Sequence, residues 1–230
     1  LLMFVFLLLS GCGEESRIKE QLDSAEKHAK LSISRLKTAL EQGQVRNATI
    51  LKNYSDYVAN NTEQYRDLAA QLGQDASTKG PLFSNLQRRL DDVIKYPEMF
   101  SNWQERYLEL QSLSDVSNIQ FFSDTLSDPA NVLSDMSNGQ LPRVNAISKA
   151  AEQASGGKTE VGQQLVGNPS YGSWRTDSSG MSFWQWYGMY SMFSNFFPSR
   201  GYGYDNWSSR RGYSYYNDVG RSSFTSPKQY

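Results

Sequence analysis

Apolar residues recur at helical spacing through the first part of the chain. From Glu14 to Glu41 there is no Pro or Gly, and charged residues are dense. The apolar positions in this stretch are three or four residues apart: Ile18, Leu22, Ala25, Ala29, Ile33, Leu36 and Leu40. This spacing predicts a long helix with one narrow apolar stripe, close to a heptad seam. We expect the helix to stop near Gly43.

A second run of the same kind extends from about residue 47 to 72. Its apolar positions are Leu51, Tyr54, Val58, Tyr65, Leu68 and Leu72, and Asn47 is a suitable N-cap. A narrow stripe on a long helix buries too little surface alone, so each run needs a partner helix. We expect a long antiparallel hairpin hinged near Gly43. The alternative is one uninterrupted helix that dimerises.

Shorter helical patterns follow up to about residue 154. Pro81 suits the first turn of a helix that ends before Pro97, and a further helix reaches about Leu113. Short apolar segments over 119–126, from 128 and from 142 to 154 predict additional short helices. Because we find no strand-like alternation in the chain, the predicted fold class is all-α.

The composition changes after residue 154. Residues 155–170 read as a polar linker, and residues 171–230 hold 18 aromatic residues but no Leu, Ile or Ala. A conventional core is difficult to build without aliphatic side chains. The predicted organisation is therefore a helical domain over 12–154, a linker over 155–170 and a largely irregular, aromatic low-complexity tail over 171–230.

The aromatic tail is the unusual chemical feature of the sequence. Indole rings can stack on sugar faces or lie at a membrane interface, and interleaved arginines can add contacts with anionic groups. The candidate ligand-stacking residues are Trp174, Trp184, Trp186 and Trp207. The alternative is a biased segment that is disordered or folds back against the helical body. Residues 181–197 can also be read as a helix with one aromatic face.

The first twelve residues carry a second signal. An apolar run of about ten residues is too short to span a bilayer, which takes about twenty, but it suits the core of a signal peptide. It closes on Leu9-Ser10-Gly11-Cys12, which contains the single cysteine of the chain and resembles the lipobox of bacterial lipoproteins. The alternatives are an ordinary signal peptide or an apolar segment with a chance cysteine.

The lipobox resemblance implies a lipid anchor on Cys12 after removal of residues 1–11. No Lys or Arg precedes the apolar run, so we expect the charged start of the signal peptide to lie upstream of Leu1. Two or three acyl chains hold a protein stably on a membrane. By the same resemblance, Gly13 after the cysteine favours the outer membrane facing the periplasm. No disulfide can form within such a mature chain.

The sequence offers little support for catalysis. His28 is the only histidine and lies on the charged face of the first predicted helix, where exposure is expected. One histidine and one acylated cysteine provide neither a nucleophile with its base nor a His/Cys metal site. The net charge of −1 gives no basic field for nucleic acid. We therefore expect no cofactor, no metal and no enzymatic activity.

The function expected from these observations is that of a lipid-anchored cell-envelope lipoprotein. It would act as a non-enzymatic interaction or scaffold protein, binding an envelope protein or a second copy through the helical stripe. The alternative is a module that binds glycan or the envelope surface through the tryptophans of the tail.

Overall fold

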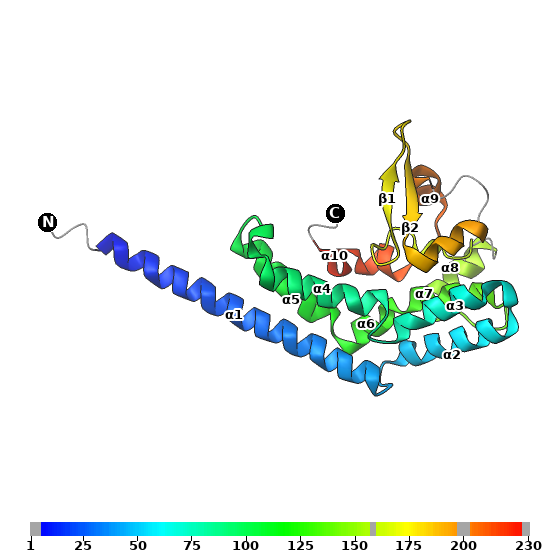
Figure 1. The fold of residues 1–230 in the computed structure, drawn as a ribbon, viewed down its shortest axis with the longest axis horizontal. Coiled ribbons are helices and arrows are strands. Elements are labelled where there is room, and N and C mark those ends of the chain that lie inside the picture. The colour runs from blue at the N-terminus through cyan, green and yellow to red at the C-terminus, as the bar shows by residue number, and fades with distance from the viewer. Residues whose placement is uncertain (1–5, 157–159, 197–202, 227–230) are drawn as a thin grey trace.

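The structure is a computed structural model that describes residues 6–156, 160–196 and 203–226. Its described residues are mostly helical, which confirms the predicted class (Figure 1). The helices of the body are α1 (Phe6–Glu41), α2 (Arg46–Asn61), α3 (Arg66–Gly73), α4 (Pro81–Lys95), α5 (Trp103–Val116), α6 (Ile119–Thr125), α7 (Ser127–Met136) and α8 (Ala146–Ser155). The C-terminal region adds strands β1 (Gly172–Thr176) and β2 (Ser182–Trp186) and helices α9 (Tyr204–Arg210) and α10 (Arg221–Phe224).

Helix α1 buries its predicted stripe against α5 and α4 (Figure 1). Ala29, Ile33 and Leu36 are buried at the centre of this contact. α5 runs alongside α1 in the same direction, and Arg106 near its start forms an ion pair with Glu26. The periodicity therefore predicted the buried face of the first helix, but its partner is α5 and not the next helix in sequence.

The turn after α1 redirects the chain instead of folding it back. Gly43 has a left-handed φ of 67°, and the N–H of Gln44 bonds to the carbonyl of Ala39 at 2.8 Å. This is the backbone geometry that glycine favours at a helix end. The expected stop near Gly43 is confirmed, and a single uninterrupted helix is wrong. From this turn α2 continues away from α1, so the long antiparallel hairpin expected over residues 14–72 does not form (Figure 1).

The second predicted helix is divided into α2 and α3, which form a tight antiparallel pair. Thr62 is extended, with φ −134° and ψ 90°, and separates the two helices. A Cβ added at Gly73 would lie 2.4 Å from the Ser55 hydroxyl, which itself donates to the carbonyl of Ala69 at 2.8 Å. The close approach of the two helices therefore depends on a residue without a side chain. Asn47 caps neither helix; it is buried and bonds to Ser123.

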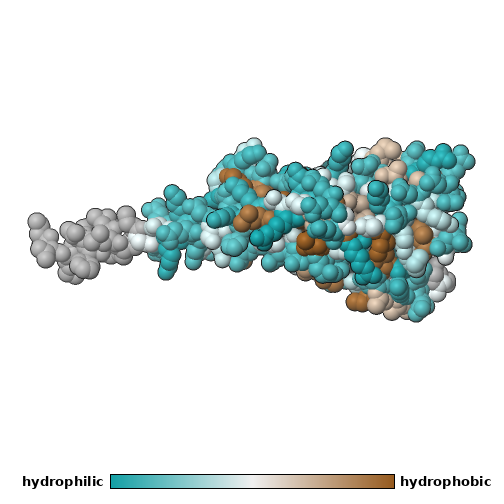
Figure 2. Space-filling view, turned by 90° about the horizontal axis from the view of Figure 1, so that it is seen from below, coloured by the Kyte–Doolittle hydropathy of each residue, from teal (hydrophilic) through white to brown (hydrophobic). Residues whose placement is uncertain are grey.

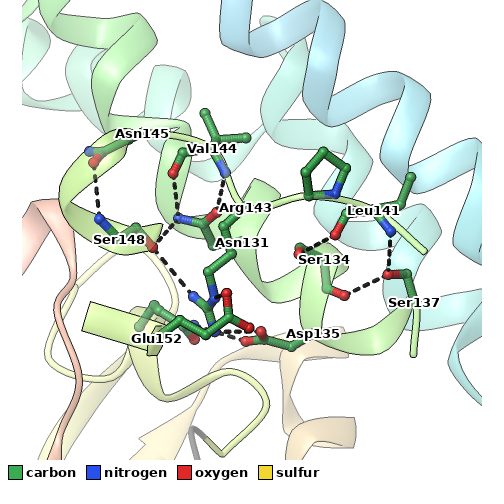
Figure 3. Close-up of polar contacts among 12 residues, drawn as sticks. Asn131, Ser134, Asp135, Ser137, Leu141, Arg143, Val144, Asn145, Ser148 and Glu152 are labelled. Carbon is green, nitrogen blue, oxygen red and sulfur yellow. Dashed lines mark hydrogen bonds and ion pairs between the residues drawn. The ribbon is translucent and has the colours of Figure 1, made fainter. Parts of the chain in front are cut away.

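A polar network fixes the loop between α7 and α8 (Figure 3). Asn131 accepts from the N–H of Val144 at 2.7 Å and donates to the Ser148 hydroxyl at 2.9 Å. Arg143 forms ion pairs with Asp135 at 2.5 Å and Glu152 at 3.0 Å. The network satisfies charges that are largely buried, as a closed structural cluster requires.

The aromatic region contains a β-hairpin that the sequence analysis did not predict. β1 and β2 pair antiparallel, with Trp174 opposite Trp184 and Gly172 opposite Trp186. The turn is organised by Asp177, whose carboxylate accepts from the backbone N–H groups of Ser179 and Met181. Side-chain-to-backbone bonds of this kind, with Gly180 at φ 84°, are typical of a tight turn. The alternative of a helix over 181–197 is wrong up to residue 186; a 3-10 helix, Gly188–Phe196, follows.

The aromatic region and the helical body share one hydrophobic core. Tyr171, Phe193 and Tyr216 are buried in the same cluster as Leu68 and Leu133 of the helices. The expectation of a largely irregular tail is therefore wrong for residues 171–196 and 203–226. Its aromatic rings pack on aliphatic side chains that the body supplies. Residues 163–166, within the expected linker, are buried as well.

Candidate functional site

The four candidate tryptophans lie together on one side of the hairpin. Trp174 has its ring centroid 5.3 Å from Trp184 and 5.3 Å from Trp207, and Trp184 is 6.0 Å from Trp186. Residues directly opposite in an antiparallel pair point to the same face, which places Trp174, Trp184 and Trp186 together. The packing is edge-on or tilted, as aromatic pairs prefer. The sequence thus identified residues that the fold brings into one cluster.

Most of this cluster is closed to solvent. Trp184, Trp186 and Trp207 are 5%, 7% and 8% exposed, and only Trp174 is half-buried. The flat faces of three of the four rings are therefore used for packing inside the molecule. A stacking surface that uses all four tryptophans, as expected from the sequence, is not available in this structure.

Gly172 sets the position of Trp184. A Cβ at residue 172 would lie 2.7 Å from two ring atoms of Trp184 and 2.4 Å from the carbonyl oxygen of Gln185. Such contacts are too short for any other side chain. The indole of Trp184 consequently lies directly against the backbone of β1 at Gly172.

Two polar groups at this place have no hydrogen-bond partner among the described residues. They are the indole Nε1 of Trp184 and the hydroxyl of Ser173, and both atoms are buried. An unsatisfied buried donor costs about 1–3 kcal/mol, so native proteins leave few of them. Unpaired donors beside a concavity are the groups that a ligand could satisfy.

A groove of about 450 Å³ opens at the same place, and we name it the hairpin groove. It lies between the hairpin, α4 and the segment that ends in α10. Its lining comprises Arg88, Gly167, Pro169, Gly172, Ser173, Trp174, Trp184, Tyr187, Tyr216, Arg221 and Thr225. Two arginines face it, and no carboxylate is among these described lining residues. The groove therefore combines aromatic rings with the side chains of two arginines.

Buried polar contacts hold the walls of the groove in place. Asp128 of α7 accepts from the backbone N–H groups of Tyr215 and Tyr216 at 2.7 and 2.9 Å. Arg89 of α4 pairs with Glu109 of α5 at 2.7 Å and donates to the carbonyl of Ser223 at 3.0 Å. The bonds of Asp128 and the bond from Arg89 to Ser223 join the helical body to the C-terminal segment. The C-terminal wall is therefore tied to the body by charged groups.

Two further carboxylates tie the start of the aromatic region to the body. The Tyr171 hydroxyl donates to Asp75 at 2.7 Å, and the Gln164 amide donates to Asp135 at 2.9 Å. Burial raises the pKa of Asp75 to about 7 and that of Asp135 to about 6. Burial also raises the pKa of Asp128 to about 7, although two backbone N–H groups oppose the shift. All three groups have internal partners and structural positions.

The polar cluster of Figure 3 is the other candidate site, and its geometry favours a structural role. A hollow of about 330 Å³ borders Asp135, Arg143 and Glu152. These charged groups already pair with one another (Figure 3). Arg143 also donates to the Ser148 hydroxyl at 3.4 Å. The cluster closes the α7–α8 loop, and its three charged side chains are paired with one another.

Cys12 lies in the part of α1 that projects from the body (Figure 1). Most residues from Gly13 to Ser24 are exposed, and the first buried residue of α1 is Ala25. Figure 2 shows the coloured portion of this projecting part, next to the body, covered mainly by hydrophilic side chains. At 1.5 Å per residue, the thirteen residues from Cys12 to Ala25 span about 20 Å. The candidate lipidation site is thus well separated from the hairpin groove.

His28 is exposed on α1, which confirms the expectation for this residue. Within the described ranges, no group of three His, Cys, Asp or Glu side chains is arranged to hold a metal ion. Over the same residues, no helix has both the length and the apolar character needed to span a bilayer.

Comparisons with known proteins assign no family. The sequence matches no protein-family model, and the searches of curated proteins and of solved structures gave no significant match.

Proposed function

We propose that this chain is a lipid-tethered, non-enzymatic binding protein of the bacterial cell envelope. The mostly exposed residues 13–24 of α1 form a stalk, and the packed part of the protein from Ala25 onward forms a head that binds the ligand or partner. The observation that carries the proposal is the position of Cys12. It lies in α1 about 20 Å before the first buried residue of that helix, and mostly exposed residues from Gly13 to Ser24 separate the two. A lipid attached there leaves the head free of the bilayer.

The exposure of the residues in the stalk supports a role as a spacer between the membrane and the head. It gives less support to a surface that binds a partner protein. The apolar stripe from Ala25 to Leu40 is covered by helices of the same chain. Upstream of it, only Ile18 and Leu22 are partly buried, and the other side chains from Gly13 to Ser24 are exposed. A scaffold that binds its partner through this stripe would first have to unpack the head. Binding is therefore assigned to the head, where the hairpin groove opens.

The tether is tested by a cysteine variant expressed from the complete gene in a Gram-negative host. Cys12→Ser should abolish incorporation of a palmitate analogue and move the protein out of the membrane fraction, because two or three acyl chains supply most of the membrane affinity. The matched control adds Ser16→Cys to the Cys12→Ser variant. This restores a thiol four residues downstream but should not restore labelling. Labelling that persists in Cys12→Ser would refute the tether.

A further inference from the structure

The outer edge of β1 presents backbone groups that the hairpin itself does not pair. The N–H of Asp177 bonds to the carbonyl of Met181 across the hairpin at 3.0 Å. Hydrogen-bonded and non-hydrogen-bonded positions alternate along an antiparallel pair, so the odd-numbered residues of β1 bond inward to β2. The N–H and C=O groups of the even-numbered residues, such as Trp174 and Thr176, therefore point away from β2.

The described part of the chain places no strand on this outer edge. Within that part, β1 has β2 as its one neighbour in the sheet, whereas the opposite edge of β2 carries a bridge between Phe183 and Gly203. Figure 1 shows the hairpin standing out from the helical body, with α9 beside β2. β1 contains neither Pro nor Lys, which commonly block pairing at the edge of a sheet. The edge of β1 is thus open to the addition of a further strand.

A second copy of β1 fits this edge in a symmetric antiparallel register. When Trp174 lies opposite Trp174 of the second copy, Thr176 lies opposite Gly172, and the outward groups of both strands meet. Aromatic residues directly opposite in a ladder stabilise the pair. Arg175, the one charged residue of β1, then lies opposite Ser173 of the second copy. A shift of two residues toward the turn would place Arg175 opposite itself, and like charges in that position are destabilising.

The surroundings of β1 suit this pairing. Trp174 is half-buried, and Tyr204, whose ring centroid lies 5.1 Å from that of Trp174, is 44% exposed. Two opposed copies of Trp174 would cover part of this aromatic surface. At the base of β1, the hairpin groove of about 450 Å³ is lined by Gly172 and leaves space there for Thr176 of the second copy. Backbone pairing and aromatic contact therefore belong to one interface.

We infer that the head binds a second copy of this chain through the outer edge of β1. The two hairpins form a continuous four-stranded antiparallel sheet, with a two-fold axis at Trp174. The inference rests on the proposed function only in assigning binding to the head, and it uses no property of the lipid. All tests are made on the full chain carrying Cys12→Ser, so failure of the tether cannot affect their result.

Sedimentation velocity in detergent, over a range of protein concentrations, measures the oligomeric state. We expect a monomer–dimer equilibrium whose dissociation constant rises at least about tenfold in Thr176→Pro, because proline removes two symmetry-related N–H groups from the interface. Thr176→Ala keeps the N–H and is the matched control, which should dimerise as tightly as the parent. A chain that is monomeric at every concentration, or a dimer that Thr176→Pro leaves unchanged, would overturn the inference.

Thermal unfolding of the dilute monomer separates dimerisation from folding. Thr176 is exposed and its N–H is directed away from β2, and proline is tolerated at such edge positions. Thr176→Pro should therefore leave the melting temperature of the monomer unchanged. If this melting temperature falls, the N–H has a partner within its own chain, and the edge is not the dimer interface.

Spin labels determine the register. Ser178→Cys provides a single thiol in the exposed hairpin turn, since Cys12 is the one native cysteine. Ser178 is four residues from Trp174, so at about 3.3 Å per residue the symmetric register places the two labels about 25–30 Å apart. Pulsed electron paramagnetic resonance measures this distance, and adding Thr176→Pro should abolish it. A distance outside this range would place the contact on another surface and refute the inference.

Discussion

At the scale of single residues, Gly172 decides the geometry of the tryptophan cluster. Its hydrogen lies where any side chain would meet the Gln185 carbonyl and the Trp184 ring. Both neighbours belong to the paired strand, so neither can move without disturbing the hairpin register. One missing Cβ therefore allows the indole to pack on the strand backbone beside the groove.

Gly172→Ala should destabilise the protein by about 1–3 kcal/mol, because overpacking against backbone cannot be relieved by a rotamer change. The measurement is urea unfolding followed by tryptophan fluorescence. Gly13→Ala is the control, since a Cβ there meets nothing within 4 Å, and it should be neutral or slightly stabilising on the exposed helix. Equal stability of Gly172→Ala and the wild type would contradict the close packing described for this residue.

Arg89 illustrates the role of a buried charge. It and Glu109 have side chains that are each 2% exposed, and Arg89 also reaches the Ser223 carbonyl. Arg89→Met should cost about 3–5 kcal/mol because Glu109 is left buried without its partner. The double variant Arg89→Met, Glu109→Leu should recover much of that loss. Lys95→Ala, in an exposed ion pair with Asp91, serves as the control and should leave the unfolding free energy unchanged.

At the scale of elements, Asp128 connects α7 with the segment leading to α10. Its two oxygens accept from consecutive backbone N–H groups, those of Tyr215 and Tyr216. Phe224 and Thr225 of the same segment are buried, and Thr225 lines the hairpin groove. The position of the wall therefore depends in part on one carboxylate of the body, beside the bond from Arg89 to the carbonyl of Ser223.

Asp128→Asn should loosen this segment specifically. An amide offers one acceptor oxygen and turns its NH₂ group toward a backbone donor, so about 1–3 kcal/mol of docking energy is lost. Hydrogen–deuterium exchange should rise over residues 214–226 while α1 and α5 remain protected. Asp115→Asn, on the exposed face of α5, should leave the exchange pattern unchanged. Uniform acceleration across the body would argue against a local role for Asp128.

Element by element, local patterns predicted the helices better than their partners. The stripe of α1, the stop near Gly43 and the start of α4 at Pro81 were all predicted correctly, because each depends on neighbouring residues. The hairpin was missed because the aromatic residues of 181–197 also fit a helical period. The turn formed by Asp177 and Gly180 was the available signal for it. The groove could not be predicted, since its walls come from segments more than eighty residues apart.

At the scale of the whole molecule, three buried carboxylates join the body to the aromatic region. Their titration makes the free energy of unfolding depend on pH. Asp75 and Asp128 have a pKa of about 7, and Asp135 has a pKa of about 6, against an ordinary value of 3.8. The folded state therefore binds more protons than the unfolded state between about pH 4 and 7. By linkage, stability is greatest below this window and falls as the pH rises through it.

The melting temperature should consequently be higher at pH 5 than at pH 8. Asp75→Asn keeps an acceptor for the Tyr171 hydroxyl and removes the titrating group, so its melting temperature should depend less on pH over this range. Asp115→Asn provides the matched control and should retain the wild-type slope. A wild-type melting temperature that rises from pH 5 to pH 8 would contradict this account.

The sequence by itself determined the helical class of the body, the buried stripe of the first helix and where that helix ends. These features follow from local periodicity, glycine conformation and composition. Only the tertiary structure decided that α5 covers α1, that the aromatic region is ordered and that a groove opens beside Trp174. The physical reason is that these features rest on contacts such as Asp75 with Tyr171 and Arg89 with Ser223, between residues 96 and 134 positions apart. No local pattern in a single sequence encodes such pairs.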